Sequence, residues 1–195
     1  MDTKRIYNRK NIFIHPDVTI LGIENITVKK RVLVGLRTVD FALPSEKTFL
    51  NIAGKLHFKG NYSIGKGCRI DVRKGGTLEI GKGGYINSFS RIIVAHKVVI
   101  GDDCAISWDC QFLDEDFHFI NYTNKAKRVE DKSKNAIVIG DHVWMGCNVK
   151  IYKGSRIAEG CVIASDSIVK GVFKQKNCLI GGNPARVLKE NIDWK

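Results

Sequence analysis

The sequence predicts an all-β fold, a parallel β-helix in which short strands wind around an apolar core. The first observation is a six-residue repeat of large apolar residues over residues 100–169: Ile100, Ile106, Phe112, Ile139, Met145, Ile151, Ile157, Ile163 and Val169. A period of six matches neither an α-helix nor an ordinary alternating strand. It is typical of short parallel strands joined by tight corners, with one hexad on each face of a solenoid.

The second observation is that a small or modest side chain follows most of these anchors after four residues. These residues are Cys104, Cys110, Val143, Val149, Ser155, Cys161 and Ser167. We expect the anchors to fill the core and the smaller residues to lie where the chain turns inward. Four of the six cysteines (Cys68, Cys104, Cys110 and Cys161) share this slot, so we expect buried thiols that act as small apolar groups. No C-x-x-C pair is present, and a zinc site is therefore not expected.

The third observation is a break in the repeat. After Phe112 the next anchor position is occupied by His118, and the repeat resumes only at Ile139. The intervening segment starts with Asp114, Glu115, Asp116, Phe117 and His118, and a polar run follows. Solenoids extrude insertions as loops without disturbing neighbouring coils, and long loops in compact domains are usually functional or disordered. We interpret residues 113–138 as an active-site loop.

The repeat also suggests a division of the chain. Residues 1–55 are expected to form an N-terminal cap or degenerate coils, and the pattern does not decide between them. Residues 56–180 are expected to form the β-helix, since the repeat becomes clear at Ile64. In the C-terminal segment, residues 181–195, Asn183 suits a helix N-cap and Pro184 the first helical position. A short helix over 185–191 would then cover the open end of the solenoid.

Composition narrows the function classes. The chain has 195 residues and is 44% hydrophobic, but it has no apolar run long enough to span a membrane. Its first residues lack the apolar block of a signal peptide, which predicts a cytoplasmic protein. The net charge is +12, yet the lysines are scattered without interleaved aromatics, so nucleic acid is not an expected partner. A phosphorylated cofactor, or peripheral contact with an anionic membrane or glycan, accounts for the charge equally well.

Two segments add a resemblance to the hexad array. Ile139-Gly140-Asp141-His142-Val143-Trp144-Met145-Gly146 is similar to an "I-G-x-x-V-W-I-G" segment, and Gly182-Asn183-Pro184-Ala185-Arg186-Val187-Leu188 is similar to a "G-x-P-A-K/R-x-I" segment. Over residues 64–189 the chain thus resembles the hexapeptide-repeat acyltransferases, and within them the maltose, galactoside and lipopolysaccharide or capsule O-acetyltransferases. The resemblance implies a left-handed parallel β-helix, a homotrimer, acetyl-CoA as donor and no metal. Handedness rests on the resemblance alone, because parallel crossovers are usually right-handed.

The expected chemistry centres on the loop. A sugar hydroxyl must lose a proton as it attacks a thioester, and a neutral imidazole can accept that proton. His118 is the candidate base, and either Asp116 or Asp114 is expected to hold its other ring nitrogen. The sequence does not choose between the two carboxylates. The segment lacks the Gly-His of the sugar acetyltransferases and is more similar to enzymes that acetylate surface polysaccharides, which leaves the acceptor open.

Other candidate residues follow from the resemblance. It places Trp144 beside the pantetheine arm and Cys147 where relatives often carry a cofactor-contacting serine. Ser165, at a corner one coil later, is expected to offer backbone contacts to pantetheine. Arg186 and Lys189 are expected to meet the phosphates of CoA. Asn87 matches an acceptor-binding asparagine of the galactoside-type enzymes. A nucleophilic Cys147 with an acyl-enzyme intermediate is the alternative, but the family's direct attack argues against it.

These observations predict an acetyl-CoA-dependent O-acetyltransferase that acts in a ternary complex on a hydroxyl of a sugar, or of a cell-surface polysaccharide or lipopolysaccharide. The alternative enzyme is an N-acetyltransferase on an amino sugar, which needs the same base. A γ-type carbonic anhydrase uses the same solenoid, but it needs three histidines on a metal and only His118 is suitably placed. A non-catalytic scaffold is a further class, and binding of acetyl-CoA distinguishes the enzymes from it.

Overall fold

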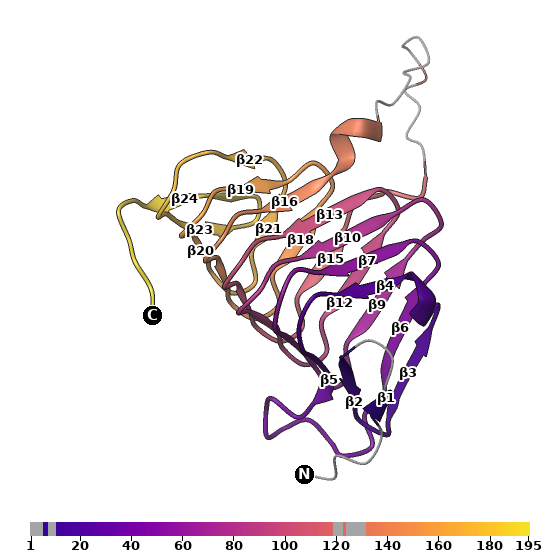
Figure 1. Ribbon diagram of the computed structural model, residues 1–195. Helices are drawn as coiled ribbons and strands as arrows, with labels where there is room; N and C mark the ends of the chain where they lie inside the picture. Colours follow the sequence, from indigo (N-terminus) through magenta and orange to yellow (C-terminus); the bar gives the residue numbers. More distant parts are fainter. Residues whose placement is uncertain (1–5, 8–10, 119–122, 124–131) are drawn as a thin grey trace.

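The computed structural model describes residues 6–7, 11–118, 123 and 132–195. Much of the polar run after His118, including Lys125, Arg128 and Glu130, lies outside the described residues. The described chain winds into stacked triangular coils, with the N-terminal strands at one end of the stack and β23 and β24 at the other (Figure 1). Three sheets, named A, B and C in the order in which each coil visits them, form the faces of the solenoid.

Within the described residues, each sheet is a column of short strands. Sheet A consists of β1 (Ile6–Tyr7), β2 (Ile12–Ile14), β5 (Val32–Leu36), β8 (Tyr62–Gly65), β11 (Tyr85–Ile86), β14 (Ala105–Ile106), β17 (Trp144–Met145), β20 (Val162–Ile163), β23 (Leu179–Gly182) and β24 (Ala185–Lys189). Sheet B consists of β3 (Val18–Leu21), β6 (Thr48–Ile52), β9 (Arg69–Val72), β12 (Arg91–Val94), β15 (Gln111–Leu113), β18 (Lys150–Tyr152) and β21 (Ile168–Val169). Sheet C consists of β4 (Ile26–Val28), β7 (Lys55–Phe58), β10 (Thr77–Ile80), β13 (Lys97–Ile100), β16 (Ile137–Ile139), β19 (Arg156–Ile157) and β22 (Val172–Phe173). Two short 3-10 helices, η1 (Ile23–Asn25) and η2 (Lys132–Asn135), lie in corners between sheets B and C.

Register places equivalent residues of successive coils above one another. Ile92 of β12 pairs with Ile70 of β9 on one side and with Phe112 of β15 on the other. All three side chains are at most 1% exposed. Such columns form the continuous apolar core that the six-residue repeat predicts, and the parallel β-helix is confirmed.

Two edges of the solenoid matter for function. The AB edge is the stack of corners that join sheet A to sheet B, at residues 15–17, 37–47, 66–68, 87–90, 107–110, 146–149 and 164–167. The BC edge is the stack of corners that join sheet B to sheet C, at residues 22–25, 53–54, 73–76, 95–96, 114–136, 153–155 and 170–171. Between β15 and β16 the described residues of this edge are 114–118, 123 and 132–136.

Most corners of the AB edge turn through one residue with a left-handed backbone, two positions before the next strand of sheet B. These residues are Gly67 (φ 77°), Phe89 (φ 65°), Asp109 (φ 59°), Asn148 (φ 56°) and Asp166 (φ 60°). Glycine, asparagine and aspartate tolerate this conformation, whereas a bulky side chain is strained there. Phe89 is therefore the exception in the series.

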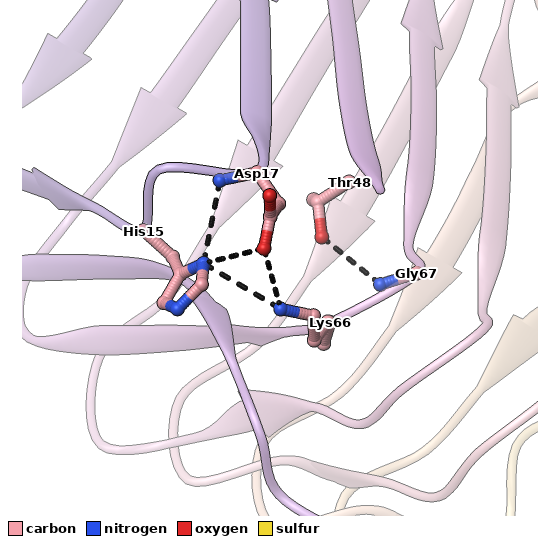
Figure 2. Close-up of polar contacts among 5 residues, drawn as sticks. All are labelled: His15, Asp17, Thr48, Lys66 and Gly67. Carbon is pink, nitrogen blue, oxygen red and sulfur yellow. Dashed lines mark hydrogen bonds and ion pairs between the residues drawn. The ribbon is translucent and has the colours of Figure 1, made fainter. Parts of the chain in front are cut away.

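The chain is coiled well before the clear part of the repeat. From β2 to β6 the strands pair in parallel with the next coil. A polar cluster ties these first coils together on the AB edge (Figure 2). The Lys66 side chain is 3% exposed, and its Nζ lies 3.0 Å from Oδ2 of Asp17 and 3.5 Å from Nδ1 of His15. The hydroxyl of Thr48 accepts a hydrogen bond from the N–H of Gly67 at 2.9 Å.

Replacing Asp17 by asparagine should lower the melting temperature near neutral pH, because it leaves the buried Lys66 ammonium without its carboxylate. The hydrogen bond from Lys66 lowers the pKa of Asp17. The stabilisation is therefore present above the unfolded-state pKa of about 3.9, and it is lost as the pH falls through the lower folded-state pKa. Thermal melts of both proteins from pH 7 to pH 2 should converge in acid. Asp40→Asn, on the same edge, is the control, and an equal effect there would contradict a specific role for Asp17.

The predicted short C-terminal helix is wrong. Residues Ala185–Lys189 form β24, which pairs antiparallel with β23 through Gly182 opposite Ala185 and Ile180 opposite Val187. Asn183 and Pro184 form the turn of this hairpin. Both residue types suit a turn as well as a helix start. The physical reason is the end of sheet A: a strand there satisfies the outer N–H and C=O groups of β23, whereas a helix would leave them unpaired.

Over the described ranges, 6–7, 11–118, 123 and 132–195, no helix is long and apolar enough to cross a membrane.

Candidate active site

The candidate base, His118, is exposed at the base of the extruded loop on the BC edge. Four residues separate it from the end of β15, and each of them contacts a corner of the solenoid. The first, Asp114, is fully buried, and its two carboxylate oxygens accept hydrogen bonds from the N–H groups of Ala95 (2.7 Å) and His96 (2.9 Å). Asp114 thus fixes the start of the loop on the preceding coil.

The next two residues make polar side-chain contacts on either side of the loop. Oε2 of Glu115 lies 2.5 Å from Nε2 of His96 in the preceding coil, and both side chains are largely buried. Oδ2 of Asp116 lies 2.8 Å from Nζ of Lys153 in the following coil. One contact is made to the preceding coil and the other to the following coil. Together they fix the position of these residues along the solenoid axis.

Phe117 completes the set of anchors. The guanidinium carbon of Arg73, two coils back on the BC edge, lies 4.3 Å from the centre of the Phe117 ring. Such cation–π contacts stabilise exposed aromatic side chains by about 0.5–1 kcal/mol. The backbone that carries His118 is therefore fixed by contacts to three other coils.

The structure does not bring the two candidate aspartates to His118. Asp114 binds backbone N–H groups and Asp116 binds Lys153. Among the residues that the structure describes, no hydrogen bond or ion pair joins either carboxylate to the imidazole. Both side chains act on the backbone ahead of His118, so orientation of the base through its second ring nitrogen stays a prediction.

Sequence analysis missed Arg73, His96 and Lys153, the residues that hold the loop. Nothing in their local sequence distinguishes them from the other arginine, histidine and lysine residues of the chain. Coil register would have found them, because each lies in a BC corner one or two coils from residue 114. A motif search therefore misses these residues, because only the stacking of coils brings them next to the loop.

The predicted donor-binding residues gather on the AB side. Trp144 opens β17 on the outer surface of sheet A and is 41% exposed. Cys147 follows in the next corner, and its Sγ donates to Oγ of Ser165 at 3.4 Å, one coil later. Gly146 leaves room for this contact, because a Cβ there would lie 2.6 Å from the Ser165 hydroxyl. The structure brings Cys147 and Ser165 together on one surface, with Trp144 beside them in the sequence.

Cys147 differs from the other cysteines in exposure. Cys68, Cys104, Cys110, Cys161 and Cys178 are buried, and Cys147 is partly exposed. This confirms the predicted burial of the four thiols in hexad slots. Burial raises the pKa of the Cys68, Cys104 and Cys110 thiols to about 12. Thiols with raised pKa values hold little reactive thiolate near neutral pH.

We therefore expect a thiol reagent such as a dithiobis-nitrobenzoate to modify one cysteine rapidly in the native protein and all six in denaturant. Cys147→Ala should remove the rapid reaction, and bound acetyl-CoA should slow it in the wild type because the donor would cover Cys147. Absorbance of the released thiolate measures both effects. Several rapid thiols would contradict the closed core, and no protection by acetyl-CoA would place the donor elsewhere.

Asn87 lies on the AB edge, one coil before Trp108. Its carboxamide oxygen accepts hydrogen bonds from the hydroxyl of Thr38 and from the N–H of Ser88. Thr38 comes from the corner loop 37–47, and its hydroxyl also lies 3.1 Å from that of Ser88. The oxygen end of the side chain is thus held by the protein.

Arg186 and Lys189 lie on β24, and both are exposed. The guanidinium of Arg186 donates to the carbonyl of Ala185 at 2.8 Å. Beyond this strand the chain folds back, so that Trp194 stacks on His142 with ring centres 4.2 Å apart and lies 6.1 Å from Trp144. The C-terminal tail therefore lies beside the outer surface of Trp144, a contact that the sequence did not predict.

Within one chain the candidate residues fall on two different edges. His118 lies on the BC edge, whereas Asn87, Cys147 and Ser165 lie on the AB edge. The two edges are separated by the width of sheet B, about 13 Å for four residue steps of extended chain. Within a single chain the candidate residues therefore lie on two separate edges of the solenoid.

No model of a known protein family matches the chain, but known bacterial proteins are similar to it over most of its length. An uncharacterised 24.8 kDa protein in the cps region of Klebsiella pneumoniae is 40% identical over 193 residues, which are 98% of this chain and 84% of that protein. An Escherichia coli K12 protein assigned to lipopolysaccharide biosynthesis as an O-acetyl transferase is 27% identical over 143 residues, 70% of this chain and 72% of that one.

Solved structures agree in fold. The polysialic acid O-acetyltransferase OatWY superposes with a TM-score of 0.65 at 24% identity, and the alignment covers 95% of this chain and 88% of that one. This likeness confirms the left-handed parallel β-helix that the resemblance implied. With the hexad array, the buried anchors and these relatives, the chain belongs to the hexapeptide-repeat acyltransferase family and is an acetyltransferase.

Proposed function

We propose that the protein transfers the acetyl group of acetyl-CoA to a hydroxyl group of a sugar in a cell-surface polysaccharide or lipopolysaccharide. The observation that carries this proposal is His118, an exposed histidine held at the base of an extruded loop by contacts to three other coils. An anchored and accessible imidazole suits a general base, since proton transfer needs hydrogen-bond reach to the substrate. The lipopolysaccharide relative supports a glycan acceptor.

In the proposed reaction, the neutral imidazole of His118 takes the proton of the sugar hydroxyl as its oxygen attacks the thioester carbonyl carbon. The tetrahedral oxyanion is stabilised by backbone N–H groups of the AB corners. The C–S bond then breaks, and the departing thiolate of CoA takes the proton from the imidazolium. The products are an acetyl ester and CoA, and no metal takes part in this scheme.

The donor is assigned to the surface of Trp144, Cys147 and Ser165, with Arg186 and Lys189 toward its phosphates. The thioester of acetyl-CoA, bound beside Cys147, would lie one coil beyond Trp108, since the N–H of Asn148 donates to the carbonyl of Trp108 at 3.0 Å. Asn87 is assigned to the acceptor on the other side of that corner. Donor and acceptor would then meet near Trp108 on the AB edge.

The separation of the candidate residues on two edges supports a homotrimer. In a cyclic trimer whose threefold axis runs along the solenoids, residues keep their height from one subunit to the next. Trp108 and His118 belong to the same coil, so His118 of one subunit would face the neighbouring Trp108 corner. A base from one chain would thereby complete the donor and acceptor surfaces of another.

Mass spectrometry and NMR of the product test the reaction. The protein is incubated with acetyl-CoA and three classes of acceptor: lipopolysaccharide, an acidic hexasaccharide of α2,8-linked sialic acid, and neutral maltohexaose. We expect an acetyl ester, which hydroxylamine removes, on at least one of them. A hydroxylamine-resistant amide on an amino sugar would instead establish the N-acetyltransferase alternative. No transfer with bound acetyl-CoA would contradict the proposed acceptor class.

A cytoplasmic location is part of the proposal. Acetyl-CoA is a cytoplasmic donor, and six unpaired cysteines suit a reducing compartment.

A further inference from the structure

Three aromatic side chains form an exposed surface on the AB edge. Phe41, in the corner loop 37–47, lies with its ring centre 5.9 Å from that of Phe89 and 5.7 Å from that of Trp108. Phe41 is 57% exposed and Trp108 is 37% exposed. We call these three residues the aromatic platform. Exposed apolar clusters of this kind mark binding sites more often than chance.

The backbone supports a role in binding. Phe89 has a left-handed conformation at a position where the equivalent corners carry glycine, asparagine or aspartate. Its ring lies over Gly67, where a Cβ would come within 2.5 Å of the ring. Strained residues persist where the surrounding structure determines them, and they are concentrated at ligand sites. The chain therefore tolerates an unfavourable residue at this corner to place an aromatic ring there.

The loop that carries Phe41 is joined to the body of the protein and to Asn87. Ala42 is 1% exposed and fixes the loop to the body of the protein. Arg37 donates to the carbonyl of Asp40 at 2.6 Å within the loop. Thr38 donates to the carboxamide oxygen of Asn87. Phe41 and Asn87 thus belong to one connected surface.

We infer that the aromatic platform is an acceptor subsite that stacks against a pyranose ring of the glycan next to the sugar that is acetylated. The inference rests on the proposed function. The C–H groups on one face of a pyranose carry partial positive charge and pack against the negative face of an aromatic ring. Asn87 and the exposed Arg37 and Thr38 lie alongside as hydrogen-bonding groups for hydroxyl or carboxylate substituents. This combination of rings and hydrogen-bonding groups matches a sugar, which presents a face of C–H groups and several hydroxyl groups.

The position of the platform agrees with this role. Trp108 belongs to the coil from which the loop of His118 extends, and the corner of Cys147 is the next one along the edge. A glycan on the platform would therefore approach the reacting groups from the Asn87 side. Such a subsite would favour an oligosaccharide over its single sugar.

The first test compares Phe41→Ala with Leu43→Ala, an equally exposed apolar residue of the same loop that has no ring contact. Binding of the sialic acid hexasaccharide and of maltohexaose is measured by NMR or calorimetry without donor. We expect the wild type to bind at least one of them, Phe41→Ala to weaken that binding about tenfold, and Leu43→Ala to leave it unchanged. Equal effects of both variants, or no binding to the wild type at millimolar glycan, would overturn the proposal.

The second test uses Phe89→Asn, which installs the residue type of the equivalent corners. If Phe89 serves binding, this variant should melt at the wild-type temperature or above and bind the hexasaccharide about tenfold more weakly. A lower melting temperature with unchanged binding would show that the ring only packs the loop, and the proposal would fall. Rescue of binding by Phe89→Tyr, which restores a ring, would support it.

Two readouts separate this proposal from others. Light scattering reports the oligomeric state of Phe41→Ala. If the substitution dissociates the oligomer that the wild type forms, the platform is a contact with a second copy of the chain instead. Turnover with the single sugar reports the reaction itself. We expect Phe41→Ala to raise the KM for the hexasaccharide while leaving the KM for acetyl-CoA unchanged. If the platform is not an acceptor subsite, acetyl transfer can still be measured. If the protein does not acetylate glycans, glycan binding can still be measured.

Discussion

Replacing His118 by alanine is expected to lower the turnover number of acetyl transfer by at least about 10²-fold, the usual scale of general-base catalysis. The side chain is exposed at the base of a loop, so its removal opens no cavity in the core. The variant should keep the wild-type melting temperature and the wild-type affinity for acetyl-CoA. Steady-state kinetics, thermal melts and calorimetry with acetyl-CoA measure the three quantities.

His57→Ala is the matched control, because His57 lies on sheet C away from both edges and should change nothing. Near-normal turnover of His118→Ala would show that another group accepts the proton, and Cys147→Ser would then be the variant to examine. Loss of donor binding in His118→Ala would show instead that the imidazole holds the donor.

The same assay defines the role of Asp116. Since its carboxylate pairs with Lys153, Asp116→Asn and Lys153→Met should each lower turnover by less than His118→Ala. The double variant should be no worse than either single change, because the two residues make one contact. If Asp116→Asn is severe and Lys153→Met is harmless, the carboxylate acts on the imidazole directly, as a triad would require.

Mixing two inactive variants is expected to restore activity. His118→Ala removes the base from the BC edge, and Ser165→Trp fills the donor surface of the AB edge with a bulky side chain. If the site is shared between subunits, a mixed trimer contains one interface with both halves intact. Random assembly of equal amounts should then give roughly a quarter of wild-type activity, because three-quarters of the trimers are mixed and each has one intact site of three.

The control for this experiment is the same mixture without dissociation and reassembly, which should stay inactive. Native mass spectrometry of differently tagged subunits shows that mixed trimers have formed. No activity in verified mixed trimers would mean that each chain carries a complete site. A monomer at micromolar concentration by light scattering would contradict the shared site altogether.

The β-helix could be predicted from the sequence because its core repeats. Ile100, Ile139 and their equivalents occur at a fixed spacing, and every coil meets the same steric demand. The C-terminal hairpin could not be predicted in this way. Asn183 and Pro184 suit a helix start as well as a turn, and only the unpaired edge of β23 favours the strand.

The candidate site was predictable only in part, for a related reason. His118 is conspicuous because it replaces an apolar anchor, and the family segments point to Trp144 and Cys147. The partners of Asp114, Glu115 and Asp116 lie in other coils, so their contacts depend on stacking that no local motif encodes. Asp116 therefore looked like a partner of His118 in the sequence, whereas the structure pairs it with Lys153.

Both ends of sheet A finish with a reversed strand, since β1 runs antiparallel to β2 and β24 antiparallel to β23. A parallel solenoid otherwise offers the edge of its last coil as a template on which another molecule can continue the winding. The reversed strands occupy that template in sheet A and oppose growth of the molecule into an axial filament. The sides of the solenoid stay available for association, and in the proposed trimer the AB edge of one chain would meet the BC edge of another there.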